Sequence, residues 1–173
     1  MRRILGIDPG SRTTGYGVIE VMGNEFRHIE SGALRIRGES LPERLYAIFD
    51  SVSEVVARCQ PTTFAIENVF MHRNADSALK LGQARGAAIC AVANHDIEVF
   101  EYTPAEIKQS VVGRGNAAKQ QVQLMVRAIL NLQTQPQADE ADALACAICH
   151  GNHASGIAKL GGVIKGSTGG RWR

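Results

Sequence analysis

Short apolar runs separated by turn residues fill the first 36 positions of the chain, a pattern typical of β-strands. Residues 4–7 end at an Asp-Pro-Gly turn, and residues 13–21 are rich in β-branched side chains. Residues 26–36 follow a Gly-Asn dipeptide of the kind found in hairpins. Because short turns join antiparallel neighbours, the pattern predicts a three-stranded antiparallel meander.

Beyond residue 40 the apolar spacing changes to that of helices alternating with short strands. Ser40 and Glu43, and again Thr103 and Glu106, have the spacing of a capping box, which opens a helix. We expect a helix that Pro61 ends, a strand at 64–67, a helix at 76–93, a strand at 97–102, a short helix after 103, a helix around 122–130 and a helix at 138–150.

This alternation predicts an α/β fold, with a five-stranded mixed sheet of three antiparallel and two parallel strands flanked by helices. The 173 residues suit one domain, which we assign to residues 1–153. Residues 154–173 are glycine-rich and basic and have no periodicity, so we expect a flexible tail.

The composition is that of an ordinary globular protein, with 45% hydrophobic residues. No apolar run approaches the ~20 residues that a membrane span requires, and the first apolar run is broken at Asp8, too early for a secretory signal peptide. Four cysteines in a chain of this length do not make a disulfide scaffold. We therefore expect a cytoplasmic protein with reduced thiols and no membrane partner.

Cys146, Cys149 and His150 have the spacing of a haem-attachment motif. We reject haem attachment, because the motif continues a predicted helix and nothing in the sequence indicates export. Zinc binding with His153 is rejected too, because ligands this crowded on one helix do not readily close a tetrahedron. Both cysteines are interpreted as small core residues.

The net charge of +2 says little, but the charges are unevenly distributed. No Asp or Glu occurs from residue 143 to residue 173, where Lys159, Lys165, Arg171 and Arg173 lie. Two interpretations stay open: a basic body that binds a polyanion, or an ordinary surface with a basic tail.

Four carboxylates stand where a buried core would not place them. Asp8 ends the first strand, Glu67 ends the fourth, and Asp139 and Asp142 share one face of the last helix. If the first and fourth strands are parallel neighbours, Asp8 and Glu67 meet at the carboxyl edge of the sheet, where open α/β sheets bind ligands. Taken singly, Asp8 suits a turn and Asp139 a helix cap; as a set, the four predict a metal site.

Clustered carboxylates repel one another unless protons or a cation compensate their charge. Hard oxygen ligands suit Mg²⁺ or Mn²⁺ rather than Zn²⁺. Four carboxylates can hold two such ions ~3.5–4 Å apart, an arrangement that catalyses in-line displacement at phosphorus. We therefore assign the four acids as catalytic residues and as ligands of Mg²⁺, which Mn²⁺ can replace.

Four segments give the chain a recognisable family resemblance: ILGIDPGSRTTGYGVIE, FAIENVFMHRNADSALKLGQARG, VVGRGNAAKQQVQ and PQADEADALACAI. Over residues 4 to about 150 the chain resembles the bacterial RuvC-type Holliday-junction resolvases. The resemblance implies a ribonuclease-H-like fold, a homodimer and Mg²⁺-dependent symmetric nicking of four-way DNA junctions in recombination and repair. It also implies a branch-migration motor complex of RuvA- and RuvB-type proteins as partner.

The resemblance extends to single residues. The family's four acids fall on the four carboxylates assigned above, and its basic residues near the cleft fall on Lys108 and Lys119. Its aromatic after the second acid falls on Phe70, which either stacks on an unpaired base or anchors a loop. Arg73 beside it, and Arg114 in a glycine loop before a helix, are further candidates for phosphate contacts.

The sequence leaves two further questions open. Gly82 and Gly86 suit either a dimer seam or tight packing within one subunit; cleavage of two strands favours the seam. Residues 8–14 are also similar to the phosphate-binding hairpin of actin-type and sugar-kinase-type phosphotransferases, although those have a second lobe. A protein that binds junctions without cutting them is the other alternative, and the complete acidic set argues against it.

Overall fold

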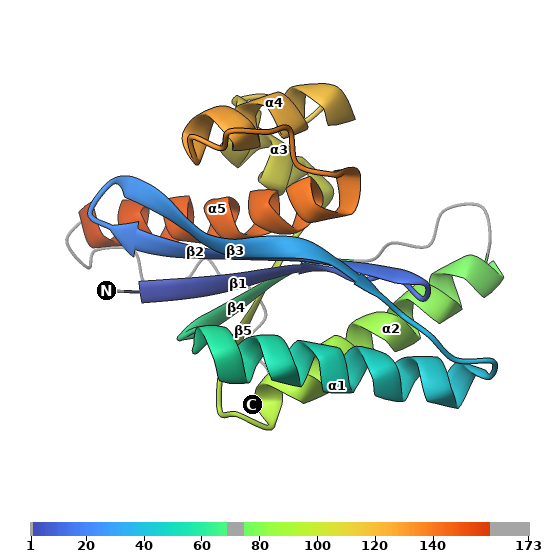
Figure 1. Cartoon of the computed structure of the whole chain (residues 1–173). Coiled ribbons are helices and arrows are strands. Elements are labelled where there is room, and N and C mark those ends of the chain that lie inside the picture. Colours follow the sequence, from blue (N-terminus) through green and yellow to red (C-terminus); the bar gives the residue numbers. More distant parts are fainter. Residues whose placement is uncertain (1, 69–74, 160–173) are drawn as a thin grey trace.

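The computed structural model describes residues 2–68 and 75–159, which contain one five-stranded sheet (Figure 1). The strands lie in the order β3-β2-β1-β4-β5, with bounds β1 Arg2–Asp8, β2 Thr13–Met22, β3 Glu25–Arg35, β4 Thr63–Glu67 and β5 Glu98–Tyr102. The first three strands are antiparallel, and β4 and β5 run parallel to β1. The predicted mixed sheet is confirmed.

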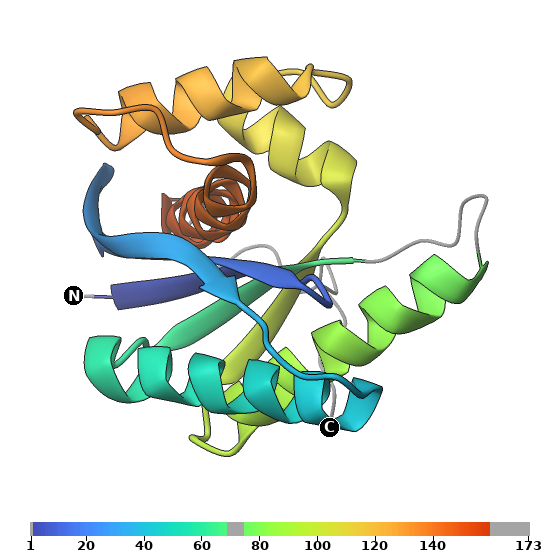
Figure 2. The same ribbon diagram turned by 45° about the vertical axis from the view of Figure 1, so that its right-hand side comes forward.

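Helices cover both faces of this sheet, with bounds α1 Leu41–Cys59, α2 Ala75–Ala93, α3 Pro104–Val112, α4 Lys119–Ile129 and α5 Ala138–Lys159. α1 and α2 pack together on one face, whereas α5 lies along the other (Figures 1 and 2). α3 and α4 pack over α5, so α5 is enclosed between the sheet and two helices.

Both predicted capping boxes are present. The Ser40 hydroxyl accepts from the backbone N–H of Glu43, whose carboxylate accepts from the backbone N–H of Ser40. The same reciprocal pair forms between Thr103 and Glu106 at the start of α3. These local bonds satisfy amides that the first turn of a helix leaves free, and they explain why the sequence predicts both starts well.

The last helix is longer than predicted, since α5 continues to Lys159 instead of ending near residue 150. At Gly151, whose residue type favours a helix end, a Cβ atom would overlap the ring of Phe26. The Asn152 amide donates to the hydroxyl and backbone oxygens of Ser110 at 3.0 and 3.3 Å. These tertiary contacts outweigh the ~1 kcal/mol by which glycine disfavours a helix. The domain boundary at residue 153 and the flexible tail stay predictions.

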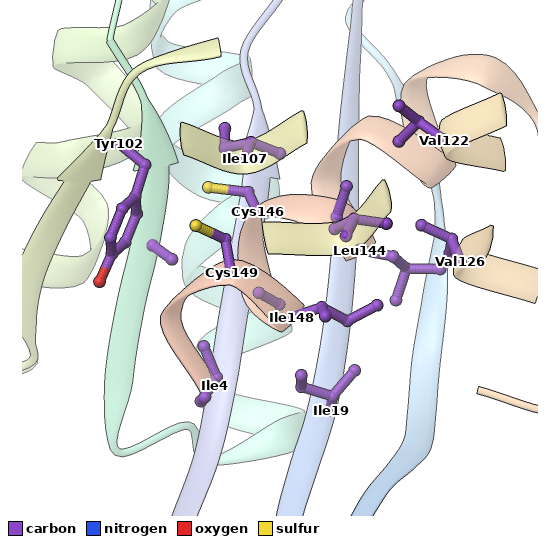
Figure 3. Close-up of a cluster of buried hydrophobic side chains, with 14 of the residues drawn as sticks. Ile4, Ile19, Tyr102, Ile107, Val122, Val126, Leu144, Cys146, Ile148 and Cys149 are labelled. Atoms are coloured by element: carbon purple, nitrogen blue, oxygen red, sulfur yellow. The ribbon is translucent and has the colours of Figure 1, made fainter. Parts of the chain in front are cut away.

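Each face of the sheet has its own hydrophobic core. On the α5 face, Cys146 and Cys149 are buried and free, and they lie beside Ile107 and Leu144 (Figure 3). The prediction that both cysteines are core residues is confirmed.

α5 lies close against the sheet because glycines face it on β1 and β2. A Cβ atom on Gly6 would overlap the backbone oxygen of Ala143, and a Cβ atom on Gly15 would overlap the backbone oxygen of Asp139. These contacts fix the start of α5 over the last residues of β1 and the first residues of β2. The start of α5 carries Asp139 and Asp142, two of the four acids.

Candidate active site

The carboxyl edge of the sheet carries the first two acids on adjacent strands. β1 and β4 are parallel partners whose register pairs Ile7 with Ile66, and Asp8 and Glu67 are the next residues along each strand. The predicted parallel pairing is confirmed. It places the two backbones ~4.8 Å apart at the point where both acids emerge.

α5 brings the other two acids to the same edge. Asp139 and Asp142 lie in its first two turns. The Asp139 backbone packs on Gly15, which is the residue paired with Asp8 across the β1–β2 ladder. Three elements distant in sequence therefore direct four carboxyl groups to one end of the sheet.

Asp8 lies in surroundings that disfavour its charge. Burial, and then the charges of Asp142, Glu67 and Asp139, raise the pKa of Asp8 from 3.8 to about 7, with Lys119 opposing the rise. Since the charges of all three other acids act on Asp8, the four form one electrostatic unit. Such a unit takes up protons or a cation to relieve its repulsion.

Two lysines flank this unit. The Lys119 Nζ donates to Asp142 Oδ2 at 2.6 Å. Burial and the charge of Asp142 raise the pKa of Glu67, and the charges of Lys108 and Lys119 oppose the rise. Both lysines, Glu67 and Asp142 line a cavity of about 210 Å³. The structure thus brings Lys108 and Lys119 to the acidic edge, as predicted.

The donor set fits a hard divalent cation. As they stand, the described residues hold no group of three or more His, Cys, Asp or Glu side chains arranged to bind a metal ion, and Lys119 pairs with Asp142 instead. However, the four candidate ligands are all carboxylates, the oxygen donors that Mg²⁺ and Mn²⁺ prefer. Burial and the charges of the neighbouring acids raise the pKa of Asp8, and a bound cation would relieve that repulsion.

In the absence of divalent ions, Asp8→Asn is expected to stabilise the protein increasingly as the pH rises from about 4 to about 7. The unfolded carboxyl ionises near pH 3.8, whereas the folded one stays protonated up to about pH 7. Ionisation in this window therefore favours unfolding of the native protein, by a few kcal/mol at ~1.4 kcal/mol per pKa unit.

Urea unfolding of the native protein and of Asp8→Asn, measured from pH 4 to 8 in the presence of a chelator, tests this effect. His150 acts in the opposite direction over part of the same window, because burial lowers its pKa to about 4. Its contribution is common to both proteins, so the informative quantity is the difference between their free energies of unfolding. A difference that does not change with pH would contradict the burial of Asp8 among acids.

Arg85 of α2 bonds to the end of β4, a contact that the sequence does not predict. Its Nε donates to the backbone oxygen of Glu67 at 3.1 Å, and its Nη2 donates to Asn68 Oδ1 at 3.3 Å. The same Nη2 pairs with Glu101 on β5 at 2.5 Å. The guanidinium therefore fixes the backbone of one of the four acids. The one sign of this role in the sequence is that an arginine stands within a helix of small residues.

The remaining predicted DNA contacts are placed only in part. Phe70 and Arg73 lie outside the described residues, so their roles stay predictions. Arg114 is exposed between α3 and α4. At the start of α4, Ala118 supplies no side-chain cap, although Gln121 Oε1 accepts from the Ala118 backbone N–H at 3.0 Å.

Residues 4–150 match the family described as "Crossover junction endodeoxyribonuclease RuvC". The chain belongs to the RuvC family. It is 57% identical to the RuvC of Acinetobacter baylyi over 96% of this chain and 95% of that protein, and 59% identical to the RuvC of Enterobacter sp. strain 638 over 87% of each. Among solved structures, Thermus thermophilus RuvC in complex with a Holliday junction substrate is 37% identical, with a TM-score of 0.84 over 90% of this chain and 96% of that one.

Membership of the RuvC family decides several of the open questions. The chain is an endodeoxyribonuclease that depends on divalent metal ions, and its sheet has the ribonuclease-H-like arrangement of RuvC. The phosphotransferase and the binding-only alternatives are not favoured. In the part of the chain that the structure describes, no helix has the length and apolar character to cross a membrane.

Proposed function

We propose that this RuvC-family chain resolves four-way (Holliday) junctions during recombination and repair by nicking two strands symmetrically. The observation that carries the proposal is the burial of Asp8 among three other carboxylates at an edge flanked by two lysines. The likeness to a RuvC bound to a junction substrate supports the choice of DNA. We assign the enzyme to the cytoplasm, where it would meet such DNA.

The four acids Asp8, Glu67, Asp139 and Asp142 would hold two Mg²⁺ ions, for which Mn²⁺ can substitute. Bound divalent ions supply activation of the attacking water and charge stabilisation of the leaving oxygen. Lys119 neutralises Asp142 in the ion-free protein. Once a cation compensates that carboxylate, the ammonium of Lys119 is free to hold a phosphate of the DNA.

The flanking residues position the DNA. Lys108 and Lys119 contact phosphates beside the acids, and Arg114 contacts a phosphate near the start of α4, where Ala118 leaves the first turn without a side-chain cap. Arg73 contacts a further phosphate, and Phe70 stacks on an unpaired base at the junction. The phosphate contacts hold the DNA backbone without reading its sequence.

The active form is a homodimer, because symmetric cleavage needs two sites. α2 suits the dimer interface. Its Ala84 and Ala88 are buried within the subunit. By contrast, a Cβ atom on Gly82 or Gly86 would meet nothing within 4 Å in the described residues. The glycines are therefore open to a second copy, with the exposed Leu79 on the same helix. The dimer works beside a branch-migration motor of RuvA- and RuvB-type proteins.

Incubation of the purified protein with a labelled four-way junction and Mg²⁺ tests the proposal. Nicked duplex products from two opposed strands are the expected result. A junction that is shifted in a gel but stays intact would indicate a binding protein, and hydrolysis of ATP without DNA would indicate a phosphotransferase. Either of these outcomes, without nicking, would overturn the proposal.

Lys108→Gln and Lys119→Gln are each expected to make junction binding less dependent on salt. Each lysine that neutralises a phosphate releases about one counterion, so each substitution should reduce the slope of log K against log[salt] by about 1. Arg2→Gln, an exposed site at the opposite end of β1, is the control and should leave the slope unchanged. Slopes that do not change in the lysine variants would remove both residues from the DNA contacts.

A further inference from the structure

Three exposed arginines gather at the end of the sheet that carries Asp8. Arg12 lies in the turn between β1 and β2, Arg35 ends β3, and Arg37 follows it in the connection to α1; we call these three residues the arginine edge. The turn and the connection lie at the same end of the sheet (Figure 1, right). No acidic side chain of the described residues forms an ion pair with any of the three.

Backbone bonds hold the arginine edge in a fixed place relative to the acids. The backbone N–H of Ile36 donates to the backbone oxygen of Arg12 at 2.9 Å, and Thr13 pairs with Arg35 in the β2–β3 ladder. On the neighbouring ladder, Gly15 pairs with Asp8. Arg35 therefore lies two strands away from Asp8 and two residues further toward this end of the sheet. With ~4.8 Å between strands and ~3.3 Å per residue, the two Cα atoms are roughly 12 Å apart.

One acid close to this edge in sequence, Glu43, is engaged at the start of α1. The Glu43 carboxylate accepts from the backbone N–H groups of Glu39 and Ser40 at the start of α1. Arg44 donates to the backbone oxygens of Gly38 and Glu39, so it belongs to the turn and not to the edge. All three residues of the arginine edge are exposed.

We infer that the arginine edge binds the phosphate backbone of the junction on the flank of the active site opposite Lys108 and Lys119. The two lysines come from α3 and α4, which lie over α5, whereas the arginines come from the β2–β3 side of the sheet (Figure 1). The acids lie between two basic flanks. DNA that crosses the sheet edge over the acids must meet both.

The spacing indicates which phosphates are bound. Since the phosphates of one strand advance 3.4 Å each along the helix axis, a separation of roughly 12 Å places this contact about three to four nucleotides from the cleaved bond. Guanidinium groups bind phosphate oxygens with two parallel hydrogen bonds, which suits three arginines on one rim. This inference rests on the proposed function, since it names a further contact with the same DNA.

The test compares Arg35→Gln/Arg37→Gln with Arg2→Gln/Arg27→Gln, in which two arginines at the opposite end of the sheet are replaced; the Arg27 side chain is 67% exposed. Binding of an uncut four-way junction is measured in Ca²⁺ over a range of salt concentrations. The edge variant should reduce the slope of log K against log[salt] by about 1.8, and the control should not reduce it. Circular dichroism checks that both variants are folded.

A second measurement locates the contact. A neutral methylphosphonate placed about three to four nucleotides from the cleaved bond should weaken binding by the native protein and leave binding by the edge variant unchanged. Equal slopes for the native protein and the edge variant would overturn the inference, and an acidic protein partner would then be the occupant of this edge. Failure of the native protein to nick the junction in Mg²⁺ would instead overturn the proposed function, so the two failures are distinguishable.

Discussion

Asp139→Asn is expected to abolish cleavage of a four-way junction while leaving junction binding intact. The change removes one negative charge and one strong oxygen donor from the acidic edge, and Asn keeps the size of the side chain. A bound metal ion contributes several kcal/mol to the transition state, so the loss of a ligand should slow nicking by roughly a thousandfold or more. Affinity for DNA rests on Lys and Arg, which the change leaves in place.

Glu140→Gln is the matched control, because it removes an acid next to Asp139 that has a different role. The Glu140 carboxylate accepts from the Ser31 hydroxyl at 2.6 Å and from the backbone N–H of Gln137 at 3.0 Å, so it is directed to β3 and the helix start. This variant should keep nicking near the native rate. Normal cleavage by Asp139→Asn would show that Asp139 lies outside the catalytic set.

The fold was largely predictable because its determinants are local. Alternating apolar residues and short turns define the meander, and capping boxes at Ser40 and Thr103 define two helix starts. The length of α5 was not predictable, since a helix normally disfavours Gly151 and only the packing of Phe26 and the bond between Asn152 and Ser110 explain its continuation. Those contacts join residues far apart in sequence.

The placement of the four acids at one edge was predictable from the sequence, whereas the contacts that support them were not. Acids at strand ends and on one helix face follow from spacing, but their meeting also required that β1 pair with β4 and that α5 pack over the same edge. The bonds from Arg85 to the end of β4 join residues 18 apart, and they depend on how α2 crosses the sheet. Even the ion pair between Lys119 and Asp142 requires the packing of α4 on α5 to be known.

Gly15→Ala is expected to impair both stability and cleavage, although Gly15 has no side chain that could take part in the reaction. Its new Cβ atom would overlap the backbone oxygen of Asp139, so the first turn of α5 must move away from the sheet. Overpacking of this kind costs about 1–3 kcal/mol. A shift of ~1 Å in a catalytic group can slow a reaction by roughly a hundredfold, and Asp139 and Asp142 would both move.

The two effects are separable by measurement. Thermal unfolding of Gly15→Ala gives the loss of stability, and nicking is then measured at a temperature where the variant is fully folded, so a residual deficit reports displaced acids. Gly115→Ala is the control for stability, since its Cβ atom would meet Ala105 at ordinary contact distances of 3.4 Å or more and Gly115 lies outside the proposed dimer interface. It should unfold at or above the native temperature. If Gly15→Ala retained native stability and native nicking, the close approach of α5 to β2 would not be what positions the acids, because the helix could then tolerate a methyl group between them.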